Sequence, residues 1–372
     1  MALPTPLMDE KLQVFINLRS QSAGLRGVQR YTAEVQRRLA DRVMPVAPRS
    51  PMSGVRGHLW EQAVLPRMIG NALLWSPANT GPLSIANQVL TIHDLGSIEH
   101  PEWYSRLFAA WYRWLTPELM KRVRRVITIS RFSRERILAL LNIDESKVVV
   151  VSPGVDATFC PRPNEEITRV CNELGIPSPH YLLSLGALEP RKNLSRLLRA
   201  WSSCVARLPE EIWLVIAGAS APRNVFNRLE LADLPPRVHL AGFVPDGDLP
   251  ALYSGALAMV YVSLYEGFGL PVLEAMASGT VPIVSGNTSL PEVVGDAGVC
   301  VNPFDIEQIA AAIEHVIDDS EHRAALRIRA IELSRHFSWE RAAAQTWTVL
   351  NQAMTFVTSG SVTHPAYGGQ AG

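Results

Sequence analysis

The stretch that decides the fold is YVSLYEGFGLPVLEAMASGTVPIVSGNTSLP, residues 261–291. It holds two carboxylates, Glu266 and Glu274, with seven residues between them. Gly267 and Gly269 form a turn that lets a ligand approach the backbone closely. Pro271 suits an early helix position, because the N–H that it lacks would be unsatisfied there. The stretch therefore predicts a glycine turn followed by a helix, near 270–278, whose free amides face a ligand.

The two glutamates can face one crevice, but their separation is too large for a close acid/base pair. Carboxylates are good acceptors for the hydroxyl groups of sugars and ribose. For an isolated pair, however, a charge in the first helical turn and an ordinary surface glutamate would be the simpler interpretation. A second group of residues is needed to favour a ligand site.

That second group follows the apolar run YLLSLGAL as Glu189-Pro190-Arg191-Lys192-Asn193. Two cations at a strand-to-helix junction suit a diphosphate, since Arg can bind it bidentately and Lys acts as a point charge. A solvated charged loop is the alternative. Both groups fall at carboxyl ends of strands in the same predicted sheet, where ligands of open α/β sheets bind.

The second half of the chain alternates between strands and helices, which predicts a doubly wound parallel sheet with helices on both faces. The predicted strands are 181–185, 212–217, 237–241, 257–262 and 281–284. The predicted helices are 193–207, 246–254, 270–278, 305–318 and 320–335, with a last amphipathic helix at 338–356.

The first half carries the same kind of pattern less clearly. Strands are predicted at 13–17, 87–95, 125–130 and 147–155, and helices from Val28 and at 131–141, whereas 49–82 is interpreted as loops around short elements. Gly24 and Gly27 lie between a strand and a helix, where they either hold an anion at the helix N-terminus or form a plain turn. His93 ends a predicted strand and is either structural or in the ligand crevice.

Composition limits the class of protein. A chain of 372 residues with 47% hydrophobic and 19% charged residues suits two globular α/β domains. Residues 1–162 hold 21 Lys and Arg against 13 Asp and Glu, whereas the remainder holds 14 against 22. A basic first half suggests an anionic partner: a phosphate-bearing acceptor, an anionic membrane surface or, with less support, nucleic acid. Residues 102–125 interleave aromatic and basic side chains, which fits either a membrane-surface helix or a core-packed aromatic helix with a solvated basic face.

Several further features are expected to be absent. The four cysteines form no CxxC pair, which argues against a structural zinc site. We find no signal peptide and no apolar run long enough to span a membrane, so a cytoplasmic protein is expected. Pro153, Pro161 and Pro163 predict a domain boundary near 155–170.

A set of short motifs, in order along most of the chain, resembles the retaining glycosyltransferases of family 4. The motifs are GLRGVQRYT (24–32), HDL (93–95), TISRFSRERI (128–137), GALEPRKN (186–193), RVHLAGFV (237–244), DLPALYSGA (248–256), EGFGLPVLE (266–274), AMASGTVPIVSGNTSLPEVVGDAG (275–298) and FSWE (337–340). The resemblance implies the GT-B architecture, in which two Rossmann-like domains with doubly wound parallel sheets face each other across a cleft. It implies an acceptor-side domain at 1–165, a nucleotide-sugar donor domain at 166–337 and a helix at 338–357 that crosses back to the first domain. The tail at 358–372 is rich in Gly, Ser and Pro and is expected to be disordered.

The resemblance also implies roles for single residues in the donor domain. Arg191 and Lys192 would neutralise the donor diphosphate, and Glu274 would hold the nucleotide ribose. Glu266 would hold the donor sugar, together with backbone that also meets the phosphates at Gly267, Phe268, Gly269 and Leu270.

Four further positions complete the implied site. His93 would lie by the reacting face of the sugar, Gly27 would help to close the site from the other domain, and backbone near Val244 would take the base. Gly186 would belong to the donor loop. Many relatives carry Arg directly after the glycine equivalent to Gly186, and here that position is Ala187, so the phosphate charge depends more on Arg191 and Lys192.

The implied activity is transfer of a hexose, with retention at the anomeric carbon and without a metal or other cofactor. No enzymic nucleophile is evident, so same-face attack is expected, with the leaving diphosphate taking the acceptor proton. The resemblance favours mannose from GDP-mannose and a glycan or polyprenyl-diphosphate-linked acceptor, as in assembly of surface polysaccharides such as the O-antigen of lipopolysaccharide. A cytoplasmic enzyme with peripheral membrane contact is expected. A UDP- or dTDP-sugar donor and a non-catalytic nucleotide-sugar-binding protein remain alternatives, whereas a nicotinamide enzyme is disfavoured because no GxGxxG follows a predicted strand.

Overall fold

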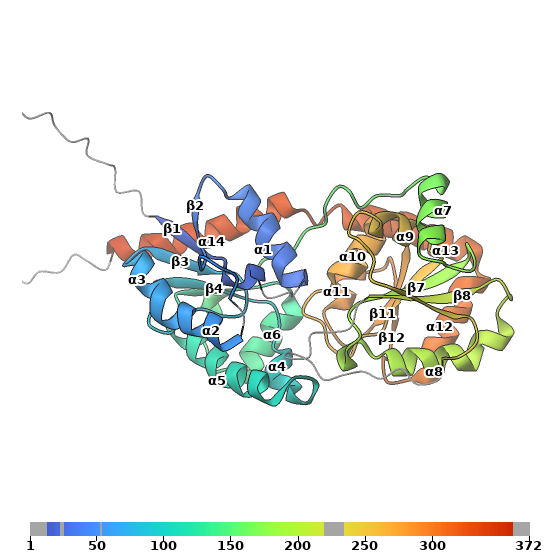
Figure 1. Cartoon of the computed structure of the whole chain (residues 1–372), viewed down its shortest axis with the longest axis horizontal. Helices are drawn as coiled ribbons and strands as arrows, with labels where there is room; N and C mark the ends of the chain where they lie inside the picture. Colours follow the sequence, from blue (N-terminus) through green and yellow to red (C-terminus); the bar gives the residue numbers. More distant parts are fainter. Residues whose placement is uncertain (1–12, 23–25, 53, 219–233, 360–372) are drawn as a thin grey trace, which may run out of the picture.

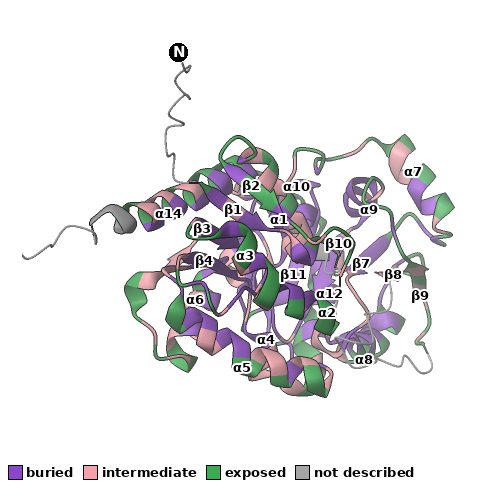
Figure 2. Cartoon of the chain, turned by 60° about the vertical axis from the view of Figure 1, so that its left-hand side comes forward, coloured by how far each residue is buried: buried purple, intermediate pink, exposed green. Residues whose placement is uncertain are grey.

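Two β-sheets, each built of parallel strands, lie next to each other along the long axis of the molecule (Figure 1). The computed structural model describes residues 13–22, 26–52, 54–218 and 234–359. The strands of both sheets are largely buried, and the exposed residues lie on the outer helices and loops (Figure 2). This arrangement confirms the two Rossmann-like sheets that the resemblance implied.

The first sheet has six parallel strands in the order β2-β1-β3-β4-β5-β6. Their bounds are β1 Val14–Asn17, β2 Val43–Val46, β3 Leu73–Ser76, β4 Gln88–Ile92, β5 Arg125–Thr128 and β6 Val148–Val150. Because β1 pairs with both β2 and β3, the direction of winding reverses between β1 and β3. That reversal opens a crevice at the carboxyl ends of these two strands.

The second sheet also has six parallel strands, in the order β12-β11-β10-β7-β8-β9. Their bounds are β7 Tyr181–Leu185, β8 Trp213–Ala217, β9 Val238–Gly242, β10 Ala258–Tyr261, β11 Val281–Ser285 and β12 Val299–Val301. Here β7 pairs with both β8 and β10, so the reversal lies between β7 and β10. The segments that follow these two strands contain the two groups of charged residues singled out in the sequence.

Helices connect the strands and cover both sheets. In the first half they are α1 Arg26–Arg38, α2 Gly54–Leu59, α3 Leu65–Ile69, α4 Gly96–Glu99, α5 Arg106–Arg122 and α6 Arg131–Leu140. In the second half they are α7 Asn164–Glu173, α8 Leu194–Cys204, α9 Leu249–Gly255, α10 Leu270–Ala277, α11 Leu290–Val294, α12 Ile306–Asp318, α13 Ser320–Ser334 and α14 Trp339–Ser359. None of the helices in the described ranges combines the length and the apolar character that a membrane span requires.

The prediction of loops around short elements at 49–82 understated the order of this segment. α2, a π-helical turn at Trp60–Val64 and α3 follow one another without a break, and β3 is a fully buried strand beside β1. β3 has only four residues, LLWS, which is too short to show a period. α7 begins at Asn164, directly after Pro163 and inside the segment interpreted as a linker.

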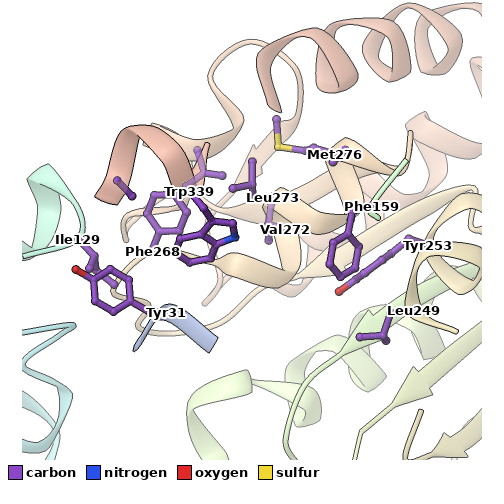
Figure 3. Close-up of a cluster of buried hydrophobic side chains, with 14 of the residues drawn as sticks. Tyr31, Ile129, Phe159, Leu249, Tyr253, Phe268, Val272, Leu273, Met276 and Trp339 are labelled. Carbon is purple, nitrogen blue, oxygen red and sulfur yellow. The ribbon is translucent and has the colours of Figure 1, made fainter. Parts of the chain in front are cut away.

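α14 packs against α1, β3, β4 and β5, and therefore crosses back from the second half to the first (Figure 1). This confirms the crossing expected of the terminal helix. At its start, Trp339 is buried against Tyr31 of α1, with ring centroids 6.2 Å apart. Figure 3 shows these two rings with Phe268 in one apolar cluster shared by both halves. Of the tail predicted from residue 358, the part beyond Ser359 lies outside the described residues.

Candidate functional site

The turn before α10 explains the glycine at position 269. Gly269 has a φ of 106°, in the left-handed region, and α10 begins at the next residue. A Cβ atom at this position would also lie 2.3 Å from Leu290 Cδ2. Glycine is therefore required by both the backbone conformation and the available space. Pro271 lies in the first turn of α10, as expected.

Glu266 lies in the loop after β10 and is buried between two cations. Its Oε1 accepts a hydrogen bond from Lys192 Nζ at 2.7 Å, and its Oε2 accepts one from Arg191 Nη1 at 3.2 Å. Burial alone would raise the pKa of Glu266, but the charges of Arg191 and Lys192 lower it to about 2. The structure thus brings together three of the predicted site residues, with the carboxylate ionised.

Asn193 and Glu189 fix the loop that carries the two cations. Asn193 binds it to neighbouring loops, and Glu189 pairs with Arg191. Asn193 has a φ of 59°, and its Nδ2 donates to the carbonyl oxygens of Val262 and Pro303 at 2.9 and 2.7 Å. The buried Glu189 carboxylate accepts from Arg191 Nη2 at 2.8 Å. Two cations and two carboxylates therefore balance in this cluster before any ligand binds.

Glu274 lies inside α10, and its side chain is 5% exposed. Its Oε1 pairs with Arg30 of α1, and its Oε2 accepts a hydrogen bond from Tyr253 OH at 3.3 Å. Burial raises the pKa of Glu274 to about 7, although Arg30 and Tyr253 both act to lower it. Glu274 therefore depends on a cation from the other half of the molecule for its charge.

His93 follows β4 and is buried beside the Tyr31 ring, with centroids 4.8 Å apart. Its Nε2 lies 2.7 Å from the Pro77 carbonyl oxygen, which can only accept, so Nε2 carries the proton of this hydrogen bond. Burial lowers the pKa of His93, so the ring is neutral at pH 7 and Nδ1 is an acceptor. The His93 backbone meets the second half of the molecule through its carbonyl oxygen.

That contact is the closest approach of Gly267 to the first half. A Cβ atom on Gly267 would lie 2.2 Å from the His93 carbonyl oxygen. Ser133 Oγ lies 3.2 Å from the His93 oxygen and 3.3 Å from the Gly267 oxygen, so one hydroxyl joins both segments. The structure therefore brings His93 and Gly267 together across the two halves.

The remaining predicted residues lie around this centre. Gly186 follows β7, and Lys192 Cε would lie 3.3 Å from a Cβ on it. Val244 is buried in the apolar cluster just after β9. Gly27 is in the first turn of α1, and nothing lies within 4 Å of the position that a Cβ on it would take. The carbonyl oxygens of Glu266 and Phe268 both accept from Ser289 Oγ, and Leu270 starts α10.

Asp246 and Asp248 lie at the start of the helix that was predicted at 246–254. Asp248 is at the N-cap position of α9, but its carboxylate makes no capping hydrogen bond and pairs instead with Arg169 at 2.8 Å. Asp246 accepts from Arg30 Nη2 at 2.9 Å. Within the described ranges, no group of three or more His, Cys, Asp or Glu side chains is arranged to hold a metal ion.

Comparison with known proteins identifies the family. The model of glycosyl transferases group 1 matches residues 170–333, and that of glycosyltransferase family 4 matches residues 70–159. The chain is 33% identical over 268 residues to the O-antigen chain mannosyltransferase B of Escherichia coli, which covers 71% of this chain and 70% of that protein. The chain belongs to glycosyltransferase family 4.

Two more comparisons define the extent of the likeness. The glycosyltransferase is 32% identical over 224 residues to the serotype-specific mannosyltransferase WbdA of Escherichia coli, and the match covers 59% of this chain but 27% of WbdA. Its fold is similar to the crystal structure of Anabaena Alr3699/HepE in complex with UDP and glucose, with a TM-score of 0.69 and 18% identity over 94% of this chain and 100% of that one. At this identity the structural likeness shows the GT-B fold alone.

Arg30 and Glu292 were not singled out from the sequence, and Glu189 was named there without a role. Arg30 lies in the motif GLRGVQRYT, which does not signal its partner, whereas Glu189 pairs with Arg191 only two positions away. Glu292, in α11, accepts from the backbone amides of Arg131 and Phe132 at 2.9 and 2.6 Å, at the N-terminus of α6. No local pattern reveals a cap that comes from the other half of the chain.

Proposed function

We propose that this glycosyltransferase transfers a mannosyl group from GDP-mannose to a glycan or polyprenyl-diphosphate-linked acceptor. The observation that carries the proposal is the pair of buried carboxylates on either side of the start of α10, with Arg191 and Lys192 against one of them. This group lies where the winding of the second sheet reverses, the usual ligand position in such sheets. The names of the relatives favour mannose as the sugar.

In this proposal the donor diphosphate lies against Lys192, Arg191 and the first amides of α10. Because Glu189 and Glu266 already balance the two cations, the diphosphate needs the helix amides as additional donors. Glu266 then accepts hydrogen bonds from sugar hydroxyls, and Glu274 accepts them from ribose. Val244 backbone and the segment that follows β9 lie beside the base.

The transfer step needs no nucleophile from the protein. The bond from the anomeric carbon to the diphosphate oxygen breaks, the acceptor hydroxyl attacks from the same face, and its proton passes to the leaving diphosphate. Lys192 and Arg191 stabilise the charge that develops on that diphosphate. The neutral His93 lies on the side of the sugar that faces the first half, and its Nδ1 can accept a hydrogen bond from a sugar hydroxyl.

Metal independence is part of the proposal, in which Arg191, Lys192 and the first amides of α10 together take the place of a metal ion at the diphosphate. Transfer should therefore persist in the presence of EDTA and should not rise when Mg²⁺ or Mn²⁺ is added. Loss of transfer in EDTA that is restored by one of these ions would contradict metal-free transfer while leaving the donor assignment intact.

The donor can be tested in two steps. We expect GDP to raise the melting temperature of the protein more than UDP, ADP or dTDP at equal concentration. We then expect labelled mannose to move from GDP-mannose to a polyprenyl-diphosphate-linked glycan. Stabilisation by UDP alone would replace the GDP assignment with a UDP-sugar, the type of ligand present in the Anabaena structures. Tight binding without transfer from any donor would instead favour a non-catalytic nucleotide-sugar-binding protein.

Peripheral contact with an anionic membrane is also proposed, but not through the basic run at 121–125. Arg122 pairs with Glu118 at 2.6 Å, Arg124 donates to the Ala353 carbonyl oxygen at 2.8 Å, and Arg125 donates to that of Ser146 at 3.4 Å. These side chains are engaged within the protein.

A different surface fits the membrane better. α2 and α5 are in contact through His58, whose ring lies 5.0 Å from that of Trp111. Along these two helices, both apolar and basic side chains are exposed: Val55, Arg56, Leu59, Arg106, Leu107, Arg113 and Trp114. Replacing Leu107 and Trp114 with Ser should reduce binding to vesicles that contain anionic lipid, whereas reversing the charge of Arg122 should change it less. Unchanged binding of the double variant would exclude this surface.

A further inference from the structure

Arg30 is the residue of α1 that reaches the donor side of the molecule. Its guanidinium donates to Glu274 through Nη1 and to Asp246 through Nη2, the latter at 2.9 Å. The same group lies 5.7 Å from the centroid of the Phe159 ring, which in turn lies 6.1 Å from that of Tyr253. Figure 3 shows Phe159 and Tyr253 side by side. A single side chain of the first half thus joins two acidic residues of the second.

Glu274 has few other means of remaining charged. It is 4% exposed, and its recorded hydrogen-bond partners are Arg30 and Tyr253. Burial is the largest influence on its pKa and raises it, and the nearby Asp246 raises it further. Tyr253 contributes only a neutral hydroxyl, since burial raises the pKa of that phenol well above its usual value. Arg30 is therefore the cation that offsets burial at this carboxylate.

The ionised form of Glu274 matters for a ligand with hydroxyl groups. An ionised carboxylate only accepts hydrogen bonds and has about four acceptor positions, whereas a protonated one donates from one oxygen. Arg30 and Tyr253 occupy one position on each oxygen, which leaves acceptor capacity on both. That capacity adjoins a cavity of about 150 Å³, roughly ten times the space that one water needs.

The cavity is itself formed by both halves. Its lining consists of residues from α1, from the segment that joins the halves and from the second half: Arg30, Glu34, Gly154, Val155, Asp156, Thr158, Phe159, Asp246, Glu274 and Trp339. The charged groups that face this space, besides Glu274, are therefore Arg30, Glu34, Asp156 and Asp246. Arg30 is the cation among these lining residues.

We propose that Arg30 is a positioning residue for the nucleotide: it favours the ionised form of the Glu274 carboxylate and holds it towards the ribose hydroxyls, and it can do so only while the two halves are together. The inference rests on the proposed function, because it assumes a nucleoside diphosphate beside Glu274. Closure then strengthens ribose binding, and ribose binding must stabilise closure by the same free energy.

Affinity for GDP, measured by calorimetry between pH 6 and pH 9, tests the inference with Arg30→Met. Without its cation, Glu274 should ionise only at higher pH. We expect affinity to fall about fivefold at pH 7, because a rise of about one unit in the pKa of Glu274 from about 7 lowers the ionised fraction from about one half to about one tenth, and we expect most of this loss to be recovered at pH 9. Arg30→Lys should retain part of the affinity at pH 7, because it retains the charge.

Two controls separate this role from a structural one. Arg37→Met, on the same helix, removes an arginine whose side chain is 63% exposed and should leave the pH profile unchanged. In a Glu274→Gln background, which cannot ionise, Arg30→Met should cause no further loss. Circular dichroism and melting curves would establish that each variant is folded.

The outcomes are distinct. If the wild-type protein binds neither GDP nor another nucleoside diphosphate, the proposed function fails. If the wild type binds and Arg30→Met binds equally well at every pH, the inference is overturned. An equal loss of affinity at pH 6, 7 and 9 would also overturn the inference. Such a loss would show that Arg30 holds the halves together without affecting the ionisation of Glu274.

Discussion

Among single residues, Glu274 should make the stability of the folded protein depend on pH. Burial raises its pKa to about 7, whereas an unfolded glutamate titrates near about 4.3. The folded chain therefore binds more protons between these values, and the contribution of this group to stability falls as pH rises through that window. We expect the melting temperature of the wild type, relative to that of Glu274→Gln, to fall by on the order of a few degrees between pH 5 and pH 8. If the melting temperatures of the two proteins change with pH by the same amount over this range, the assignment is contradicted.

Glu61 provides the second prediction at this scale. Its carboxylate has no exposed area and accepts from Asn17 Nδ2 and Thr80 Oγ1, both at 2.6 Å, while Arg19 Nε lies 3.2 Å away. Replacing it with Ala leaves a buried cation without its counter-ion, which typically costs about 3–5 kcal/mol. The midpoint of urea unfolding should fall accordingly. Glu118→Ala, which breaks an exposed pair with Arg122, is the control and should change the midpoint little.

The sequence revealed residues whose role depends on their own backbone conformation. It did not reveal residues whose role depends on a side chain far away along the chain. Gly269 and Pro271 indicate the start of a helix, because glycine permits the turn before it and proline suits its first turn. Arg30 meets Glu274 from 244 positions away, and Glu61 meets Asn17 from 44. Such pairs become visible only once the sheets have formed, because no spacing along the chain encodes them.

At the scale of elements, α6 is capped by both halves of the molecule. Ser130 Oγ accepts from the Ser133 amide at 3.0 Å within the helix's own segment. Glu292 of α11 accepts from the next free amides, those of Arg131 and Phe132. A carboxylate there also favours the helix dipole. α6 therefore has its N-terminus fully paired only while α11 is in contact with it.

We expect Glu292→Ala to weaken the contact between the halves more than it weakens the fold. Loss of a capping group costs about 0.5–2 kcal/mol, enough to shift an equilibrium between closed and open forms several-fold. Small-angle scattering should show a larger radius of gyration for the variant. Glu135→Ala, an exposed residue on the same helix, serves as control. An unchanged radius of gyration would show that the cap does not hold the halves together.

Elements with a strong period were predicted well, and short or Pro-flanked ones were not. β7 and α6 came within a residue of their predicted bounds, because each combines an apolar period with a clear start or stop. β3 has four residues, and α7 follows a segment rich in Pro, so neither presents enough repeats for a pattern. The π-helical turn that holds Glu61 has no sequence signal at all.

At the scale of the whole molecule, alternation of strands and helices predicted the parallel sheet of the second half, and the resemblance to family 4 implied the pair of Rossmann-like domains. How closely the two sheets approach was not predictable, since it depends on contacts such as Tyr265 OH to Glu99, at 2.8 Å, and Arg30 to Glu274. Each of these pairs one residue from either half. The described structure is therefore a closed arrangement held by several polar contacts and by the shared apolar cluster.

Gly267 is the position where this closeness can be tested most directly. A Cβ atom there would lie 2.2 Å from the His93 carbonyl oxygen and 3.0 Å from Asp94 Cβ, so Gly267→Ala must push the halves apart. Displacement of the reacting groups by about 1 Å can cost roughly a hundredfold in rate, and we expect transfer to fall by about that factor while GDP still binds the second half. Gly247→Ala is the matched control, because nothing lies within 4 Å of its Cβ position. If Gly267→Ala transfers sugar at the wild-type rate with an unchanged radius of gyration, catalysis does not require the approach of the Gly267 and His93 backbones, since the added methyl group has no other place to go.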